Sequence, residues 1–347
     1  MKRQPAKQFY LIAAVSCISL LTGCGDSAQG VKLAKEFGQT ADEFKEKTDK
    51  LANDIYASCI RRARYIDLVA VPGREADEVR FEALKNCELL NKPTATRAVM
   101  ANTVVYDYIK AVGHLAGDKN VSFQSELEEV RTSLINLGQT QLPFVLPEQA
   151  VNQGITIANA VFEWAAKSYR NIELSKAVIC TKEPLKAYTT GLGQAYDSGY
   201  INGILANEED TVRRYFNGIA TSQTASLKNS TKVMVVRDYE ALNSNSYDSL
   251  MTVRNNRAAA ARYIKVLSLT ATANADIADE LSKAGYIVKP EQCSAYLKPP
   301  AGQSPVSSLH LQPNHQPILS FWEKSRITQI LTKYNSHVRH ELDQIKL

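Results

Sequence analysis

The chain has 347 residues, and its 41 Lys and Arg against 36 Asp and Glu give a formal net charge of +5. Three of the positive charges precede the first long apolar segment, so the chain from Cys24 onward carries only about +2. Nucleic-acid-binding proteins concentrate Lys and Arg on one face or one segment, and this composition excludes nucleic acid as a partner. The length allows a sizeable buried core and suggests one or two domains.

Residues 1–23 have the pattern of a secretory signal peptide. Lys2, Arg3 and Lys7 form a positive start, and the stretch from Phe9 to Leu21 is apolar. That stretch is too short to cross a bilayer, which takes about 20 apolar residues. Small residues then close it, as a signal peptidase requires.

The cleavage region, Leu21-Thr22-Gly23-Cys24, resembles the lipobox of bacterial lipoproteins, and the resemblance is confined to these first 24 residues. It implies that Cys24 becomes the first residue and carries diacylglycerol plus an amide-linked acyl chain such as palmitate. Two or more chains, at ~0.8 kcal/mol per buried CH₂, anchor a protein permanently. The alternative is an ordinary secretory signal in which Cys24 has no role.

The residues after Cys24 bear on sorting. In lipoproteins of double-membraned bacteria, an aspartate directly after the cysteine favours retention in the inner membrane. Here that position is Gly25, and Asp26 comes one later. The resemblance therefore implies an outer-membrane protein that faces the periplasm, with residues 24–30 as a lipidated tether.

Four further cysteines, Cys59, Cys87, Cys180 and Cys293, suit an oxidising compartment and allow three pairings. Cys59 and Cys87 are equidistant from Gly73, which lies in a Val-Pro-Gly turn signal between two helical patterns. In an antiparallel hairpin the two sulfurs would face each other. We therefore predict Cys59–Cys87 and, by elimination, Cys180–Cys293; the alternative is four buried thiols. No CxxC spacing indicates a redox dithiol or a zinc knuckle.

Apolar residues recur at helical spacing almost throughout the chain after residue 31, which predicts an all-α fold of long, antiparallel helical hairpins of coiled-coil type. The N-terminal bundle is predicted over residues 31–138. Its expected helices run from Val31 to about Val69, from Ala76 to Pro93, which ends or kinks the helix, from Thr94 to Leu115 and from Val121 to Leu137.

Residues 139–147, which include Pro143, interrupt the pattern and predict a linker to a second helical region over 148–297. There we expect helices over Pro147–Ile179, Pro184–Leu205, Glu208–Leu227 and Thr231–Ala284. The β-branched stretches Val233–Val236 and Ile264–Thr272 would suit strands on propensity alone. The absence of turn signals between Leu250 and Asn274 favours helix.

A proline-rich linker is predicted over residues 298–317, followed by an amphipathic C-terminal helix over 318–347. A helix presented in this way is suited to a partner's groove. The candidate partner-binding residues are Phe321, Ile327, Leu331, Tyr334, Val338 and Leu342. The alternative is that this helix folds back and completes the protein's own bundle.

Four small residues, Gly191, Ala195, Gly199 and Gly203, are spaced by four and form a smooth ridge on one helix. Glycine costs a helix about 1 kcal/mol, so the ridge indicates that another backbone comes close. The sharper hypothesis is a ligand cleft, for a glycan or similar molecule, lined by the neighbouring Tyr188, Tyr196 and Tyr200.

Catalytic signatures for zinc hydrolysis, di-iron carboxylate chemistry, acyl-serine chemistry, haem attachment and nucleotide binding are missing from the sequence. His337 and His340 share a helix face, but two ligands do not make a metal site. We therefore expect neither a metal nor a cofactor, and we assign no catalytic residues.

The function expected from the sequence is that of a membrane-anchored periplasmic lipoprotein that binds or scaffolds an envelope protein or a second copy of itself. The alternative is an enzyme acting on envelope polymers, or a glycan-binding protein, that uses the tyrosine-lined cleft. The missing catalytic signatures favour the binding function over the enzyme, but a site built from residues scattered in sequence would leave no such signature.

Overall fold

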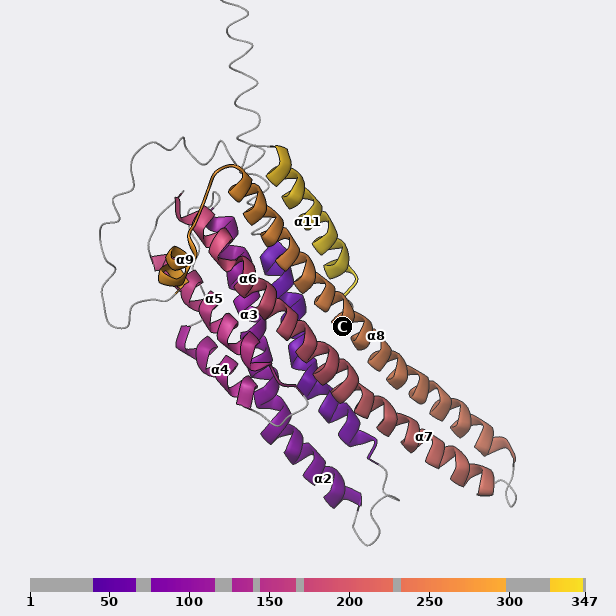
Figure 1. Cartoon of the computed structure of the whole chain (residues 1–347). Coiled ribbons are helices and arrows are strands. Elements are labelled where there is room, and N and C mark those ends of the chain that lie inside the picture. Colours follow the sequence, from indigo (N-terminus) through magenta and orange to yellow (C-terminus); the bar gives the residue numbers. More distant parts are fainter. Residues whose placement is uncertain are drawn as a thin grey trace, which may run out of the picture.

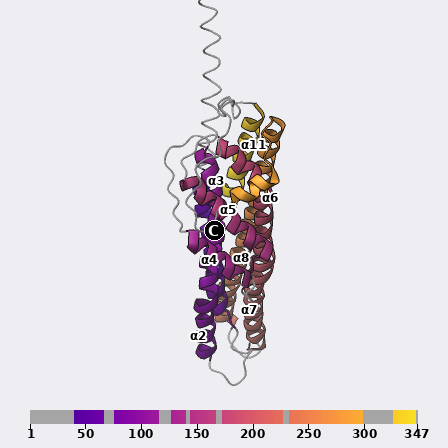
Figure 2. The same ribbon diagram turned by 60° about the vertical axis from the view of Figure 1, so that its left-hand side comes forward.

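The computed structural model describes residues 40–66, 76–115, 127–139, 144–166, 172–226, 232–297 and 325–345. Within these ranges all regular secondary structure is helical, and the helices pack side by side into an elongated bundle (Figures 1 and 2). The predicted all-α fold is confirmed. The predicted signal peptide, tether and proline-rich linker, with Cys24 and Phe321, lie outside the described residues.

The N-terminal helix covers residues 40–64 and ends in a turn at Tyr65, earlier than the predicted end near Val69. Two of the elements that follow, η2 and η3, are π-helical. The remaining elements are α2 (Ala76–Asn86), η2 (Cys87–Asn91), α3 (Lys92–Leu115), α4 (Leu127–Gln139), α5 (Glu148–Ala166), α6 (Ile172–Gln194), η3 (Ala195–Leu205), α7 (Ala206–Ser226), α8 (Lys232–Lys283), α9 (Pro290–Leu297) and α11 (Ser325–Asp343).

Three predicted helix interruptions, near residue 93, between residues 179 and 184 and between residues 205 and 208, are not helix ends in the structure. Helix α2 continues through η2 into α3 past Pro93, because a π-helical turn shifts the backbone hydrogen bonds and accommodates a residue without an N–H group. Pro184 lies inside α6, and that helix continues through η3 into α7 without a break at Leu205. Burial of the neighbouring Leu185 shows that packing overrides the local signal there.

The predicted boundary at residues 139–147 does not separate two cores. Phe144 and Leu146 are buried there, and the Leu146 N–H donates to the carbonyl of Leu137, 3.3 Å away, which joins the segment before α5 to the end of α4. One apolar cluster, which we call the main core, extends from Ala41 to Ile345. The described parts of both predicted bundles therefore belong to one folded unit.

The main core fills only one end of the molecule. Along the described side chains of the long helices, its last members are Ile55 on the N-terminal helix, Leu205 at the end of η3 and Val253 on α8. Beyond this level two hairpins project: the α2 arm, made of residues 56–66 with α2 and η2, and the α7 arm, made of α7 with the first half of α8 (Figure 1). A small second cluster of Cys59, Ala63 and Cys87 lies inside the α2 arm.

Both predicted disulfides are confirmed. Cys59 and Cys87 join the N-terminal helix to η2 with their Cα atoms 5.7 Å apart, inside the α2 arm where the main core does not reach. Cys180 and Cys293 join α6 to the short helix α9 with their Cα atoms 5.1 Å apart. Each bond therefore fixes an element that has little apolar packing of its own.

The C-terminal helix α11 folds back onto the bundle, so the apolar stripe predicted to meet a partner is not available to one. The stripe residues that the structure describes, Ile327, Leu331, Tyr334, Val338 and Leu342, are all buried. The helix packs antiparallel on α8, and the buried Glu341 accepts hydrogen bonds from Arg262 and Lys265, at 2.9 and 2.6 Å. The stripe is strongly apolar because α8 covers it.

Removing each disulfide by a double Cys→Ser substitution should lower the free energy of unfolding by different amounts. The closed loops span 28 and 113 residues, which corresponds to about 3.5 and about 5 kcal/mol of lost chain-entropy stabilisation. Urea unfolding without reductant measures both values. A larger loss for Cys59–Cys87 than for Cys180–Cys293 would contradict this account.

Candidate functional site

The three tyrosines predicted to line a cleft lie in the main core instead. Tyr188, Tyr196 and Tyr200 are each 0 % exposed, and burial raises the pKa of all three phenols above the ordinary value. The Tyr188 hydroxyl donates to the carbonyl of Ala101 at 2.6 Å. The Tyr196 ring packs edge-on against Tyr263 with ring centroids 4.8 Å apart. Their spacing reflects packing into the bundle, and they do not form a ligand cleft.

The small-residue ridge serves close helix packing at Gly191. A Cβ atom added there would lie 2.3 Å from the Cβ of Ala150 on α5, a distance that real side chains essentially never show. Gly154 on α5 is equally constrained, since an added Cβ would lie 2.5 Å from the Tyr188 ring. Helices α5 and α6 therefore approach each other closely at these glycines. This is the helix packing that the small-residue ridge indicated.

Alanine at Gly191 should destabilise the protein, whereas alanine at Gly193 should not. The added Cβ at Gly193 would make an ordinary 3.4 Å contact with Ile264, so the higher helix propensity of alanine should add up to about 1 kcal/mol of stability. Gly191→Ala must instead push α5 away and should cost roughly 1–3 kcal/mol. Urea unfolding of the matched pair tests the difference in sign, and equal effects would refute it.

A buried polar cluster missed by the sequence reasoning ties four helices together inside the core. The Asn102 amide on α3 donates to the Thr48 carbonyl at 3.0 Å and to the Tyr196 hydroxyl at 2.9 Å. The Tyr263 hydroxyl of α8 donates to Asn102 at 2.7 Å. These residues are far apart in sequence, and only the fold brings them together.

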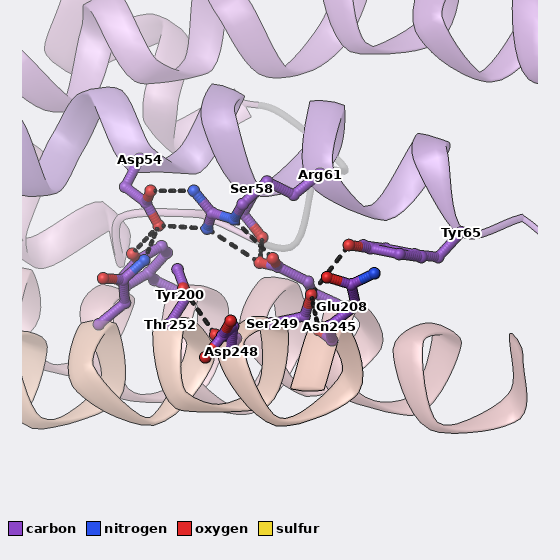
Figure 3. Close-up of polar contacts among 11 residues, drawn as sticks. Asp54, Ser58, Arg61, Tyr65, Tyr200, Glu208, Asn245, Asp248, Ser249 and Thr252 are labelled. Carbon is purple, nitrogen blue, oxygen red and sulfur yellow. Dashed lines mark hydrogen bonds and ion pairs between the residues drawn. The ribbon is translucent and has the colours of Figure 1, made fainter. Parts of the chain in front are cut away.

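A second buried polar cluster lies where the two arms leave the main core, and we call it the arm network (Figure 3). Arg61 is its centre. Its guanidinium donates to both carboxylate oxygens of Asp54, at 2.6 and 2.9 Å, and to both of Glu208, at 2.6 and 3.0 Å. Asp54 also accepts from Tyr200 at 2.5 Å and from Asn256 at 2.8 Å.

Two carboxylates thus share one guanidinium in a setting with little water. The side chains of Asp54, Glu208 and Arg61 are 11, 2 and 24 % exposed. Burial by itself would lower the pKa of Arg61, but the hydrogen bonds and charges of Asp54 and Glu208 outweigh it and raise the pKa. Arg61 is therefore fixed as a cation between the arms.

The arm network has one signal in the sequence that could have located it. Asp54, Ser58 and Arg61 follow one another at i, i+4 and i+7, so they form a polar face on the N-terminal helix. Ser58 is 1 % exposed and its hydroxyl donates to Glu208. A buried polar face that follows an apolar stripe predicts that the helix packs against a different neighbouring element there. It does not predict which element that is.

Beyond this network, Tyr65 makes polar and aromatic contacts between the arms, and Val212 of α7 is fully buried. The Tyr65 hydroxyl lies 2.8 Å from the Ser249 hydroxyl on α8. The Tyr65 ring lies against Tyr215 and Phe216 of α7, with centroids 5.4 and 5.5 Å away. The arms thus meet along the N-terminal helix from Asp54 to Tyr65.

An open groove of about 580 Å³ runs along the outer side of α6, η3 and α8. Its apolar part includes small residues, Gly193, Ala271 and Ala275, and its volume is in the range of ligand sites. Lys182 spans one end through an ion pair with Asp279 at 2.6 Å. The other lining residues are Glu183, Lys186, Thr189, Thr190, Gln194, Asp197, Ile264, Ser268 and Thr272.

Two of the hydroxyls that line the groove are engaged within their own helices. The Thr189 and Thr272 hydroxyls donate to carbonyls of their own helices, at 2.8 and 2.9 Å, which holds them in local bonds. His337 and His340 lie on the exposed side of α11. Among the described residues, no group of three or more His, Cys, Asp or Glu is placed to hold a metal ion.

Within the described part of the chain, none of the helices has both the length and the hydropathy needed to cross a membrane. No known family model, curated protein or solved structure matches the chain. The site must therefore be interpreted from its own geometry.

Asp107 on α3 is a titratable group whose charge opposes folding. Burial raises its pKa from an ordinary 3.8 to about 7, although Lys110 and Lys45 lower it, and its Oδ1 atom has no hydrogen-bond partner among the residues that the structure describes. A raised pKa means that the folded state holds this proton more tightly than the unfolded state. Stability is therefore lost as the pH rises through the window between these values.

Asp107→Asn should stabilise the protein at pH 8, by roughly 2–4 kcal/mol at about 1.4 kcal/mol per unit of pKa shift, and change little near pH 4. Urea unfolding at both pH values measures the gap. Asp210→Asn, at an exposed residue of α7 paired with Arg214, is the control and should change stability little at either pH. A gain that does not depend on pH would contradict the assignment.

Proposed function

We propose that this protein is a lipoprotein of the bacterial envelope, anchored by acyl chains on Cys24, facing the periplasm from the outer membrane, and that it binds or scaffolds another envelope component. The observation that carries the proposal is the pair of disulfides. They indicate folding in an oxidising compartment outside the cytoplasm. The lipobox resemblance then supplies the attachment to a membrane.

The groove along α6 and α8 supports binding as the activity. Both helices are held in the main core along this stretch, because Leu192, Val266 and Leu267 are fully buried behind it. A partner would therefore meet a preformed surface and would spend little binding free energy on ordering it. The partner expected is an envelope protein or a second copy of the chain.

The alternative function is an enzyme or glycan-binding protein with a tyrosine-lined cleft. The three tyrosines that would line this cleft are not accessible to a ligand. Tyr188, Tyr196 and Tyr200 face the core and their hydroxyls bind protein groups. A glycan site needs exposed aromatic faces or free polar groups in a depression. The groove, which is lined by small aliphatic and polar residues, favours binding over that alternative.

The course of the N-terminal helix supports an orientation for the anchored molecule. Its residue-40 end belongs to the compact end of the bundle, where Lys47 donates to the carbonyl of Ile345 at 3.3 Å, and its other end lies in the α2 arm. A tether that precedes this helix would attach the compact end to the membrane. The two arms would then point away from it.

Cys24→Ala should abolish incorporation of labelled palmitate and release the protein from the membrane fraction, because the acyl chains have no other attachment point. Cys17→Ala, in the apolar segment that cleavage would remove, is the matched control and should label normally. Metabolic labelling and fractionation measure both. Unchanged labelling of Cys24→Ala would refute the anchor, while loss of the anchor alone would leave the disulfide-based compartment standing.

A further inference from the structure

We infer that the arm network is a conformational latch: it holds the α2 arm against the α7 arm, and it opens reversibly while the main core stays folded. The proposed binding function does not require this latch. It depends on where the apolar core ends, on what replaces it between the arms, and on how each arm is held together.

The contacts that join the arms differ in kind from those of the core. Among the described residues, the main core has no member on residues 56–66, on α2, on α7 or on α8 before Val253. What joins the arms instead is the guanidinium of Arg61 with two carboxylates, the Ser58 bond to Glu208, and the polar and ring contacts of Tyr65. The described contacts of the seam are thus polar at its base and aromatic at its far end, and Val212 of α7, which is fully buried, is not part of the main core.

Opening this seam costs less than parting the main core. Water can replace each hydrogen bond of Arg61, Asp54 and Glu208, and the desolvation penalty that burial imposes on these charges is recovered when they are hydrated. Apolar surface in the main core recovers nothing comparable in water. Local opening of this kind takes place in the least apolar parts of a structure.

Each arm can move as a unit because it is held together internally. The α2 arm is closed by the Cys59–Cys87 disulfide and its own small cluster. The α7 arm is a hairpin in which α7 packs along α8, and the ion pair of Glu209 and Arg257 joins the two helices at its base. An opening would therefore separate two hairpins that keep their internal links, while the helices along the seam lose packing on that face, fray and expose their amides to exchange.

The π-helical segments lie at the level where bending is needed. Segment η3 ends at Leu205, directly before α7, and its Tyr200 is bonded to Asp54. Segment η2 occupies the matching place in the other arm, where Tyr56 of the N-terminal helix donates to Glu88. π-Helical turns are rare and recur at functional sites. Here one lies at the base of each arm.

Hydrogen–deuterium exchange of the purified protein, with both disulfides intact, tests the latch. Amides of the N-terminal helix after Asp54 and of α7 should exchange together, faster than amides of α3 and α5 and with little dependence on added urea. Arg61→Met should accelerate exchange in both segments by about tenfold or more, because it leaves two buried carboxylates without their cation. Exchange in α3 and α5 should stay unchanged.

Two further variants keep the test decisive. Ser58→Ala removes only one hydrogen bond to Glu208 and should give a smaller acceleration in the same segments, even if Arg61→Met fails to fold. Arg214→Ala, which removes an exposed ion pair of α7, should change neither segment. The inference is overturned if both arms exchange only at the rate of α3, or if Ser58→Ala and Arg61→Met accelerate the whole molecule uniformly.

Discussion

The extent of the apolar core is the constraint on which the rest of the structure depends. Backbone hydrogen bonds let the N-terminal helix, α7 and α8 continue past Ile55, Leu205 and Val253, but isolated helices are marginal in water and need packing to persist. Each arm therefore needs another source of order. One is the covalent Cys59–Cys87 bond, and the other is the set of charged hydrogen bonds around Arg61.

These two sources are not equivalent. A disulfide restricts the unfolded chain and fixes two elements permanently, whereas a buried ion pair contributes less than well-packed apolar side chains of the same volume. What the arm network supplies is alignment: only one register of the N-terminal helix lets Arg61 and Ser58 meet Glu208. In the same register Asp54 meets Tyr200 and Asn256. The arm network thus fixes the relative position of the two arms but adds little to the free energy of unfolding.

The sequence predicts best what is local or symmetric. Helical periodicity predicts the all-α fold, and the equal distances of Cys59 and Cys87 from a turn predict their pairing. It fails at Pro93, where a π-helical turn accommodates the proline, and at Pro184, where packing overrides a local break. It also fails for Tyr188 and for α11, because periodicity shows that a face is apolar and cannot show whether α8 or a partner covers it. The arm network joins residues about 150 positions apart, which no local pattern reveals.

The N-terminal helix connects the two ends of the molecule. It runs as one helix from the compact end, where Phe44 packs against Tyr263 at a centroid distance of 5.7 Å, to Arg61 at the base of the arms. The groove along α6 and α8 lies on the compact end and is rigid. A partner that binds in the groove meets a preformed surface. A partner that binds between the arms must first supply the free energy of opening the arm network. Because one helix carries both ends, a restraint on its first turns biases the latch at its last turns to the extent that the restraint differs between the closed and open states.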